Sequence, residues 1–291
     1  GRMVNARLLE AEKADRKFML RTFSHGPNDG GISVGRALLS NQYKIVDNFD
    51  VLTTVLAGIT EADHPVSVTQ CDLTESRMWV KVRSESVQYV AREFLKGYRN
   101  PFSVEHTGYE AGEEPIISAG FRVSNSETGG GKFTIEPCFE IRICRNGMVI
   151  TEKALKQVHL GGRLEVGEIN WAADTQRASL DLILKMSRDA VREFMSYEFL
   201  EHWVKSFEEE SQTPVDDVQG TVEKLAKVEK WTEAEEAGIL DRFMRGGQFT
   251  AGGAMQAVTA HAQDVVNPER AAALEASGID VMRKAVQLVT V

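Results

Sequence analysis

An alternation of apolar and polar residues runs through 132–146, KFTIEPCFEIRICRN, and constrains the fold more than any other feature. Five apolar side chains fall on one side of this run, namely Phe133, Ile135, Phe139, Ile141 and Ile143. Apolar residues at every second position are typical of a β-strand with one buried face. A second β-rich run, 116–127, precedes it across a TGGG turn. We therefore predict a long, twisted hairpin, in which Pro137 makes a bulge or lies at an edge.

The rest of the chain predicts an α+β fold. Two shorter β-rich runs, at 66–74 and 77–84, read as another hairpin. Helical periodicity or helix-forming composition predicts helices over 3–22, 33–39, 49–63, 85–97, 174–209, 221–231, 232–245 and 267–289. We expect a twisted antiparallel β-sheet of hairpins packed by the long helix at 174–209. This core domain would span 1–210, and 211–291 would form a C-terminal helical appendage.

Composition excludes several classes of protein. No apolar run in the 291 residues approaches the ~20 needed to span a bilayer, and the first residues lack the apolar core of a signal peptide. The three cysteines form no C-x-x-C pair and are odd in number, which argues against a disulfide framework or a zinc ribbon. We expect a cytoplasmic protein without metal or cofactor.

Charge is unevenly distributed. Residues 201–241 hold twelve acidic residues against four lysines, so the formal charge of −9 leaves the rest of the chain at −1. Cations alternate with aromatic residues in 77–99, and Trp79, Lys81 and Arg83 share one face of the predicted hairpin. Cations neutralise phosphate and a flat ring stacks a base, as binding of a single strand requires. The alternative is a half-exposed strand whose Trp79 packs under a helix.

We take the candidate nucleic-acid-binding residues from this hairpin, the TGGGK turn and a basic loop further on. They are Arg77, Trp79, Lys81, Arg83, Lys132, Lys153, Lys156, His159 and Arg163. Glycines followed by lysine also suggest a phosphate loop, but the full G-x-x-x-x-G-K-[ST] pattern is absent, which favours a simple turn. The histidines are scattered and no G-x-S-x-G motif is present, so no catalytic residues are predicted. The acidic run suggests a solvated helix face, or a segment that shields the basic sheet.

Five segments together resemble the phage and plasmid protein family built on domain of unknown function 932. They are 38–52, 71–82, 121–137, 143–150 and 156–162, within a region of roughly residues 30–200. The resemblance implies a bacteriophage protein made in the cytoplasm of an infected bacterium. It also marks a set of candidate site residues, which are Asn125, Ser126, Glu127, Cys144, Asn146, Gly147 and His159.

Three functions are open at this point. The order of hairpins and long helix is similar to the core of single-strand annealing proteins, which predicts a non-catalytic DNA-binding protein of recombination or replication, active on single-stranded DNA. Self-association into a homo-oligomer is expected because hairpin sheets leave open edges. The alternative is an effector that binds a host protein through its acidic helices. An enzyme with a site near Asn125, Glu127 and His159 is the third.

Overall fold

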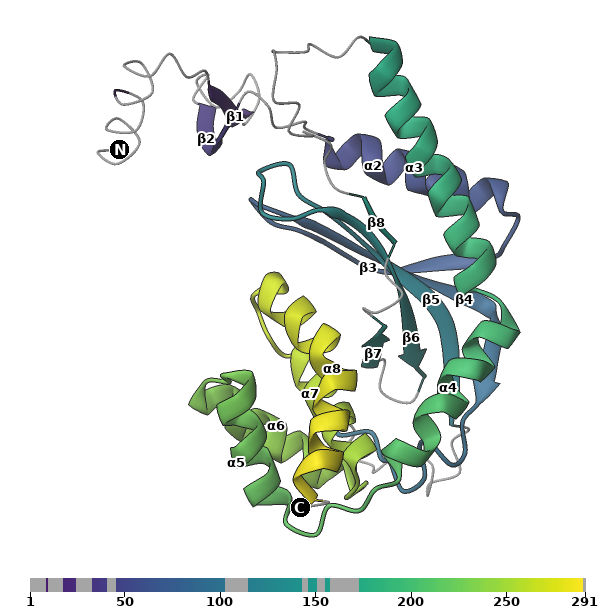
Figure 1. Ribbon diagram of the computed structural model, residues 1–291, viewed down its shortest axis with the longest axis vertical. Coiled ribbons are helices and arrows are strands. Elements are labelled where there is room, and N and C mark those ends of the chain that lie inside the picture. Colours follow the sequence, from purple (N-terminus) through teal and green to yellow (C-terminus); the bar gives the residue numbers. More distant parts are fainter. Residues whose placement is uncertain are drawn as a thin grey trace.

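The computed structural model describes residues 18–24, 33–40, 46–102, 115–142, 146–150, 155–157 and 173–289, together with Leu9. Within these residues it contains seven helices and two antiparallel sheets, which confirms the predicted α+β class (Figure 1). A two-stranded hairpin of β1 (Phe18–Ser24) and β2 (Ser33–Ser40) lies apart from the main sheet.

The main sheet is an antiparallel ribbon built from consecutive strands. Its order is β3 (Val66–Leu73), β4 (Met78–Val90), β5 (Ile116–Asn125), β6 (Phe133–Ile141) and β7 (Asn146–Val149), with β8 (Leu155–Gln157) also paired to β6. Both predicted hairpins are therefore present. Pro137 makes no bulge, because it lies opposite Phe121 and the register does not shift there. Of the two predicted alternatives, the edge position is the one that holds, on the side of β6 away from β5. Pro137 falls between the stretches of β6 that pair with β8 and β7, where a missing N–H breaks no ladder bond.

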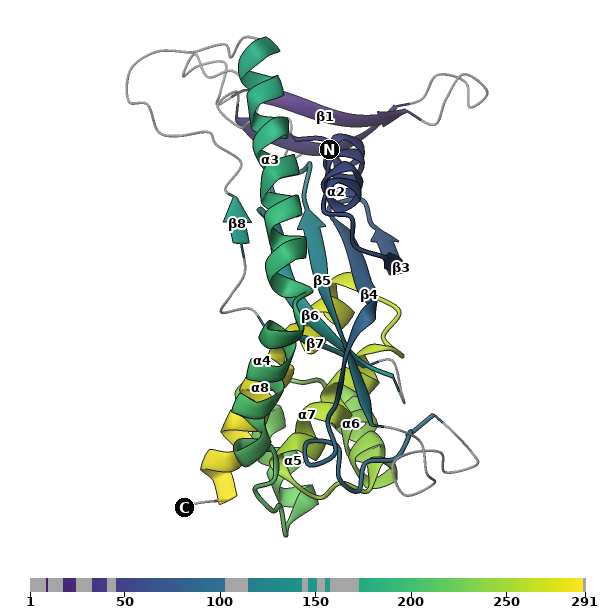
Figure 2. The same cartoon turned by 90° about the vertical axis from the view of Figure 1, so that its right-hand side faces the viewer.

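One face of the sheet is apolar and is covered by α2 (Asn48–Glu61), α3 (Ala173–Phe194) and α4 (Tyr197–Ser211) (Figures 1 and 2). Alternation along the strands supplies its apolar side chains. Those that meet α2 and α3 are Met78, Val80, Val82, Phe121, Val123, Phe133 and Ile135. They pack against Val51, Val55 and Ile183 of the helices, so this face is a conventional hydrophobic core.

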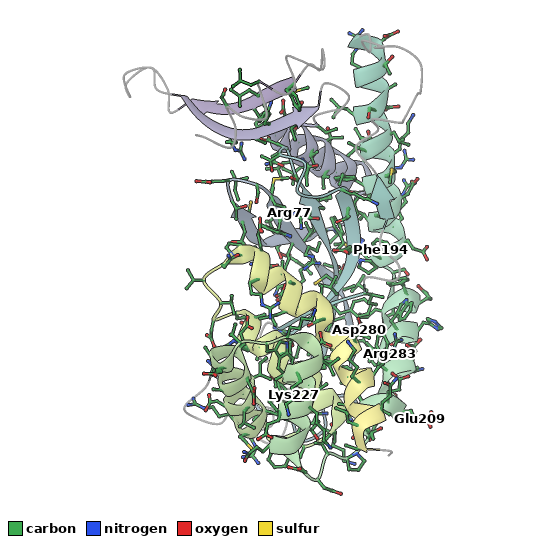
Figure 3. The ribbon with its side chains drawn as sticks, turned by 60° about the vertical axis from the view of Figure 1, so that its left-hand side comes forward. Arg77, Phe194, Glu209, Lys227, Asp280 and Arg283 are labelled. Atoms are coloured by element: carbon green, nitrogen blue, oxygen red, sulfur yellow. The ribbon has the colours of Figure 1, made fainter. Side chains whose placement is uncertain are left out.

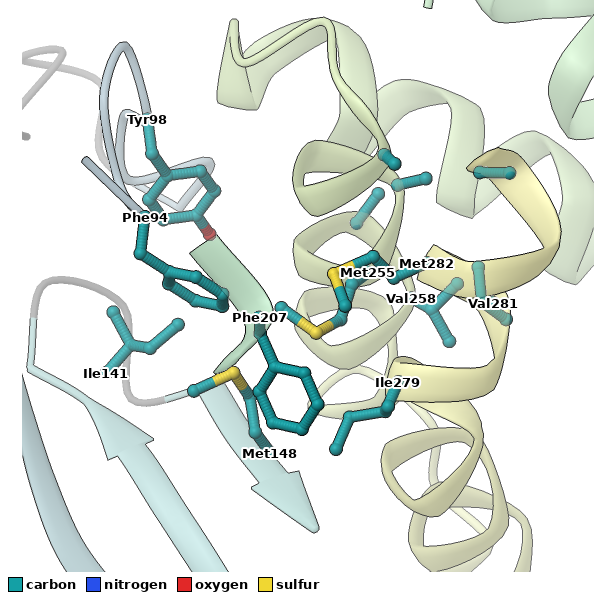
Figure 4. Close-up of a cluster of buried hydrophobic side chains, with 14 of the residues drawn as sticks. Phe94, Tyr98, Ile141, Met148, Phe207, Met255, Val258, Ile279, Val281 and Met282 are labelled. Atoms are coloured by element: carbon teal, nitrogen blue, oxygen red, sulfur yellow. The ribbon is translucent and has the colours of Figure 1, made fainter. Parts of the chain in front are cut away.

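The opposite side of the sheet carries α5 (Val218–Glu229), α6 (Glu233–Gly246), α7 (Ala251–Ala262) and α8 (Pro268–Val289) (Figure 1). A second hydrophobic cluster joins these helices to the strands and to α4 (Figure 4). Its members include Phe94, Ile141, Met148, Phe207, Met255, Val258, Ile279, Val281 and Met282. The predicted division after residue 210 therefore runs through a shared hydrophobic core.

Several predicted helices are wrong. Residues 18–22 of the helix predicted over 3–22 belong to β1, which pairs with 33–40 as β2, and the rest of that range lies outside the described residues except Leu9. Residues 85–90 continue β4 instead of starting a helix. The long helix at 174–209 is two helices, because the side chain of Ser196 accepts the backbone N–H of Phe199 and starts α4. No helix is predicted over the residues of α7. Local composition misled these predictions where tertiary pairing decides the conformation.

The start of α6 illustrates local and long-range contacts acting together. The side chain of Thr232 accepts the N–H of Glu235, and the Glu235 carboxylate accepts the N–H of Thr232, which forms a capping box. Arg270 of α8 donates two hydrogen bonds to the same carboxylate, at 2.6 and 2.9 Å. This hydrogen bonding to Arg270 lowers the pKa of Glu235 to about 2.

This shift predicts an acid-dependent loss of stability. An unfolded glutamate titrates near pH 4.3, so the Glu235 contribution is complete above that pH and is lost as the pH falls toward 2. Replacing Glu235→Gln should cost roughly 1–3 kcal/mol at pH 7, a range that allows for the solvent exposure of Arg270. Urea unfolding at pH 7, 4 and 3 measures the difference, which should shrink with acid. Exposed Glu233→Gln is the control, and an unchanged difference at pH 3 would contradict the prediction.

Candidate functional site

The second face of the sheet is polar and contains a buried cation. The side chain of Arg122, only 6% exposed, donates to Glu136 from Nε at 3.2 Å and from Nη2 at 2.7 Å. Its Nη1 donates to the backbone carbonyl of Ala272 in α8 at 3.0 Å and lies 4.0 Å from Glu275. A buried charge needs such partners, since each ion loses its hydration. Helix α8 therefore supplies part of the hydrogen bonding and negative charge that replace water around Arg122.

Two of the predicted nucleic-acid contacts lie on the same face and are neutralised. Lys81 forms an ion pair with Glu275, and Arg83 Nη1 lies 2.5 Å from Glu140 Oε1. The prediction that these side chains share one face with Trp79 is confirmed, because all three border the space between the sheet and α8. Their positive charge, however, is balanced by carboxylates.

Trp79 does not form the exposed stacking platform that its position predicts. It is 5% exposed and shares a small cavity of about 10 Å³ with Pro268 and Ala272 of α8. The guanidinium of Arg77 lies 5.6 Å from the centre of its ring. The alternative reading, a tryptophan packed under a helix, is the one that the structure supports, because a buried ring offers no face to a base.

A cleft of about 600 Å³ opens between the polar face and the segment that joins α7 to α8. Two cations and three acids line it, namely Lys81, Arg83, Asp72, Glu140 and Glu275, which gives a formal charge of −1. Burial raises the pKa of Cys138 in its wall to about 12, so that thiol stays protonated at neutral pH. The hydroxyl of Ser67, also in the wall, has no hydrogen-bond partner among the described residues.

Arg77 lies at the other end of the polar face, beside the glycine turn between β5 and β6 (Figure 3). Its guanidinium donates to the carbonyl of Gly130, and a Cβ on Gly131 would approach Arg77 Nη2 to 2.0 Å. A side chain at this position would have to displace the end of Arg77. The turn is therefore a hairpin connection, as favoured above. Two of its amides, those of Thr128 and Gly130, donate to the Ser126 hydroxyl instead of being free for phosphate.

The positive charges at the end of the sheet that carries Arg77 are not neutralised by carboxylates of the described residues as those of Lys81 and Arg83 are. Within the described part of the chain, neither Arg77 nor the exposed Lys132 forms an ion pair with a carboxylate. The backbone of Lys156 in β8 pairs with Thr134, two residues from Lys132. Lys153, His159, Arg163 and Cys144 lie outside the described residues.

The segment Asn125 to Glu127, marked by the family resemblance, has a structural role. Asn125 Nδ2 donates to the carbonyl of Val46 at 3.0 Å and to Asn48 Oδ1 at 2.8 Å. Glu127 accepts the backbone N–H of Asn48 at 2.7 Å, and its other oxygen accepts from Arg36 at 2.9 Å. A carboxylate at a helix N-terminus satisfies free N–H groups. This segment therefore caps α2 and anchors β2.

Two further marked residues, Asn146 and Gly147, lie in β7, and Gly147 lines the cleft. Asn146 pairs with Ile141 of β6 and Gly147 with Glu140. A Cβ on Gly147 would come within 3.3 to 3.5 Å of Glu275, Lys81 and Cys138, so the glycine allows the ion pair to lie close to the strand. Among the described residues, no group of three His, Cys, Asp or Glu side chains could hold a metal ion.

None of the helices in the described ranges combines the length and apolar composition needed to cross a lipid bilayer. No protein-family model matches the chain, and no curated protein or solved structure matches it either. The resemblance to the phage and plasmid family stays a prediction from its five segments.

The buried ion pairs predict a strong effect at Glu275. Replacing Glu275→Gln leaves Lys81 and Arg122 short of a carboxylate and should cost roughly 3–5 kcal/mol in urea unfolding. The double variant Lys81→Met with Glu275→Leu removes both charges of one pair and should recover most of that loss. Glu269→Gln, at an exposed position of α8, is the matched control with a loss below about 1 kcal/mol. Equal losses for the two glutamates would contradict the assignment.

Proposed function

We propose that the protein binds single-stranded nucleic acid without catalysing a reaction, at the sheet end that carries Arg77 and Lys132. The observation that carries the proposal is the difference in pairing among the candidate cations. Lys81 and Arg83 have carboxylate partners, whereas Arg77 and Lys132 have none among the described residues. Cations without a protein counterion gain most from a phosphate, because binding then releases small ions.

The polar groups near this end also favour binding over catalysis. Glu127 and Glu136 are engaged by arginines, and Ser126 is occupied by backbone contacts. In the wall of the cleft, burial raises the pKa of the Cys138 thiol and keeps it protonated. A nucleophile needs an adjacent base or a lowered pKa, which these groups lack. Combined with the family resemblance, the proposed role is that of a phage DNA-metabolism protein acting on a single strand.

A charge reversal tests this proposal directly. The double variant Arg77→Glu with Lys132→Glu should weaken binding of a fluorescent single-stranded oligonucleotide at least tenfold in an anisotropy titration. Losing two phosphate contacts should also reduce the slope of log affinity against log salt by about 1.4. The control is Lys224→Glu with Lys227→Glu in α5, far from Arg77 (Figure 3). Equal affinities for variant and control would refute the proposed interface.

The cleft supports a second candidate function, the binding of a small cationic ligand. Its volume suits a small molecule, and its lining charge of −1 disfavours a polyanion. We expect spermidine to raise the melting temperature of the protein, and Asp72→Asn to reduce that rise. A rise that Asp72→Asn leaves unchanged would place the amine elsewhere.

A further inference from the structure

Strand β3 is an open edge of the main sheet (Figure 2). Within the described part of the chain it pairs only with β4, and its central residues 68–71 are exposed. Val68 is 50% exposed and Leu73 is 68% exposed. Edge strands are normally protected by lysine, proline or several charges, yet β3 has a single charged residue, Asp72. Such an edge can accept another strand.

The neighbouring hydrogen bonds show which backbone groups of β3 point outward. Thr74 donates to Arg77 at one end and Glu85 donates to Pro65 at the other, so Thr74 and Pro65 face β4. In antiparallel pairs this direction alternates residue by residue. Counting inward from both ends, the backbones of Val66, Val68, Cys71 and Leu73 face away from β4. The counts from the two ends differ by one residue, and the register shift between Val68 and Gln70 accounts for this difference.

We propose that a second copy of this chain adds to β3 as an antiparallel strand, with the two-fold axis between Thr69 and Gln70. This register sets Val68 opposite Cys71 of the second copy, and Val66 opposite Leu73. Each residue whose backbone faces away from β4 then lies opposite a residue of the second copy whose backbone also faces away from its own β4. Two eight-residue edges thus form one continuous ladder between two sheets.

The side chains agree with the same register. Val66, Val68, Cys71 and Leu73 pair with Ser84, Val82, Val80 and Met78 of β4. The last three of these β4 residues belong to the core that packs against α2 and α3. The proposed pairs therefore place apolar groups together on one face and cover the exposed Val68 and Leu73. On the other face, Asp72 meets Ser67 of the second copy, so like charges do not face each other. A slip of one residue would mix the two faces.

This fit identifies a second copy as the occupant because the strand is complementary to itself. An unrelated strand could satisfy the backbone, but only an edge with the same spacing across the register shift would match all four outward positions. The inference is independent of nucleic-acid binding, since Arg77 and Lys132 lie outside β3.

Disulfide trapping tests the register. With Cys144→Ser as background, Val68→Cys should form an intermolecular disulfide with Cys71 on mild oxidation, because residues opposite each other have Cα atoms about 5.5 Å apart. The same two cysteines within one strand are too far apart to join. Ser86→Cys, an exposed position of β4 beyond its pairing with β3, is the matched control and should stay largely uncrosslinked.

Sedimentation velocity of the unmodified chain gives a second measurement that needs no engineered cysteine. We expect a dimer at micromolar concentration, and a monomer after Val68→Lys with Leu73→Lys, two changes at exposed positions. A monomer at all concentrations, or equal crosslinking through Ser86→Cys and Val68→Cys, would overturn the proposed pairing.

Discussion

The buried charge of Arg122 is the constraint on which the arrangement of this protein depends. A sheet with one apolar face can leave the other face to solvent, but here that face carries a guanidinium, a lysine and several carboxylates that are largely shielded from water. Their burial is tolerable only because α8 brings the Ala272 carbonyl and the Glu275 carboxylate. The position of α8 then fixes the cover over Trp79 and one wall of the cleft.

Sequence patterns predicted the features that depend on neighbouring residues, and they missed contacts between residues that are far apart in the chain. Period two identified both hairpins and placed Trp79, Lys81 and Arg83 on one face. The partner of Lys81, Glu275, lies 194 residues away, so no local pattern could reveal that the charge is neutralised. Helix α7 escaped prediction because it is buried on nearly every side and therefore has no polar stripe to set its period.

The candidate site residues show the same limit of prediction from local sequence. The family resemblance marks the segment from Asn125 to Glu127 as a candidate site, but its side chains cap α2 and bind Arg36. Polar residues that serve a helix start in a remote element look, in the sequence, like residues that serve a ligand. Among the candidate cations, Lys81 and Arg83 form ion pairs with carboxylates. Arg77 and Lys132 form none within the described residues, and the sequence alone does not reveal this difference.

The central claim is that α5 to α8 complete the sheet instead of being attached to a finished domain. Differential scanning calorimetry and near-ultraviolet circular dichroism of a chain ending at residue 210, compared with the full chain, test it most directly. Without α8, Arg122, Lys81 and Trp79 lose their cover, so the shortened chain should show neither a cooperative transition nor a tertiary signal. A cooperative transition with a preserved aromatic spectrum in the shortened chain would contradict the claim.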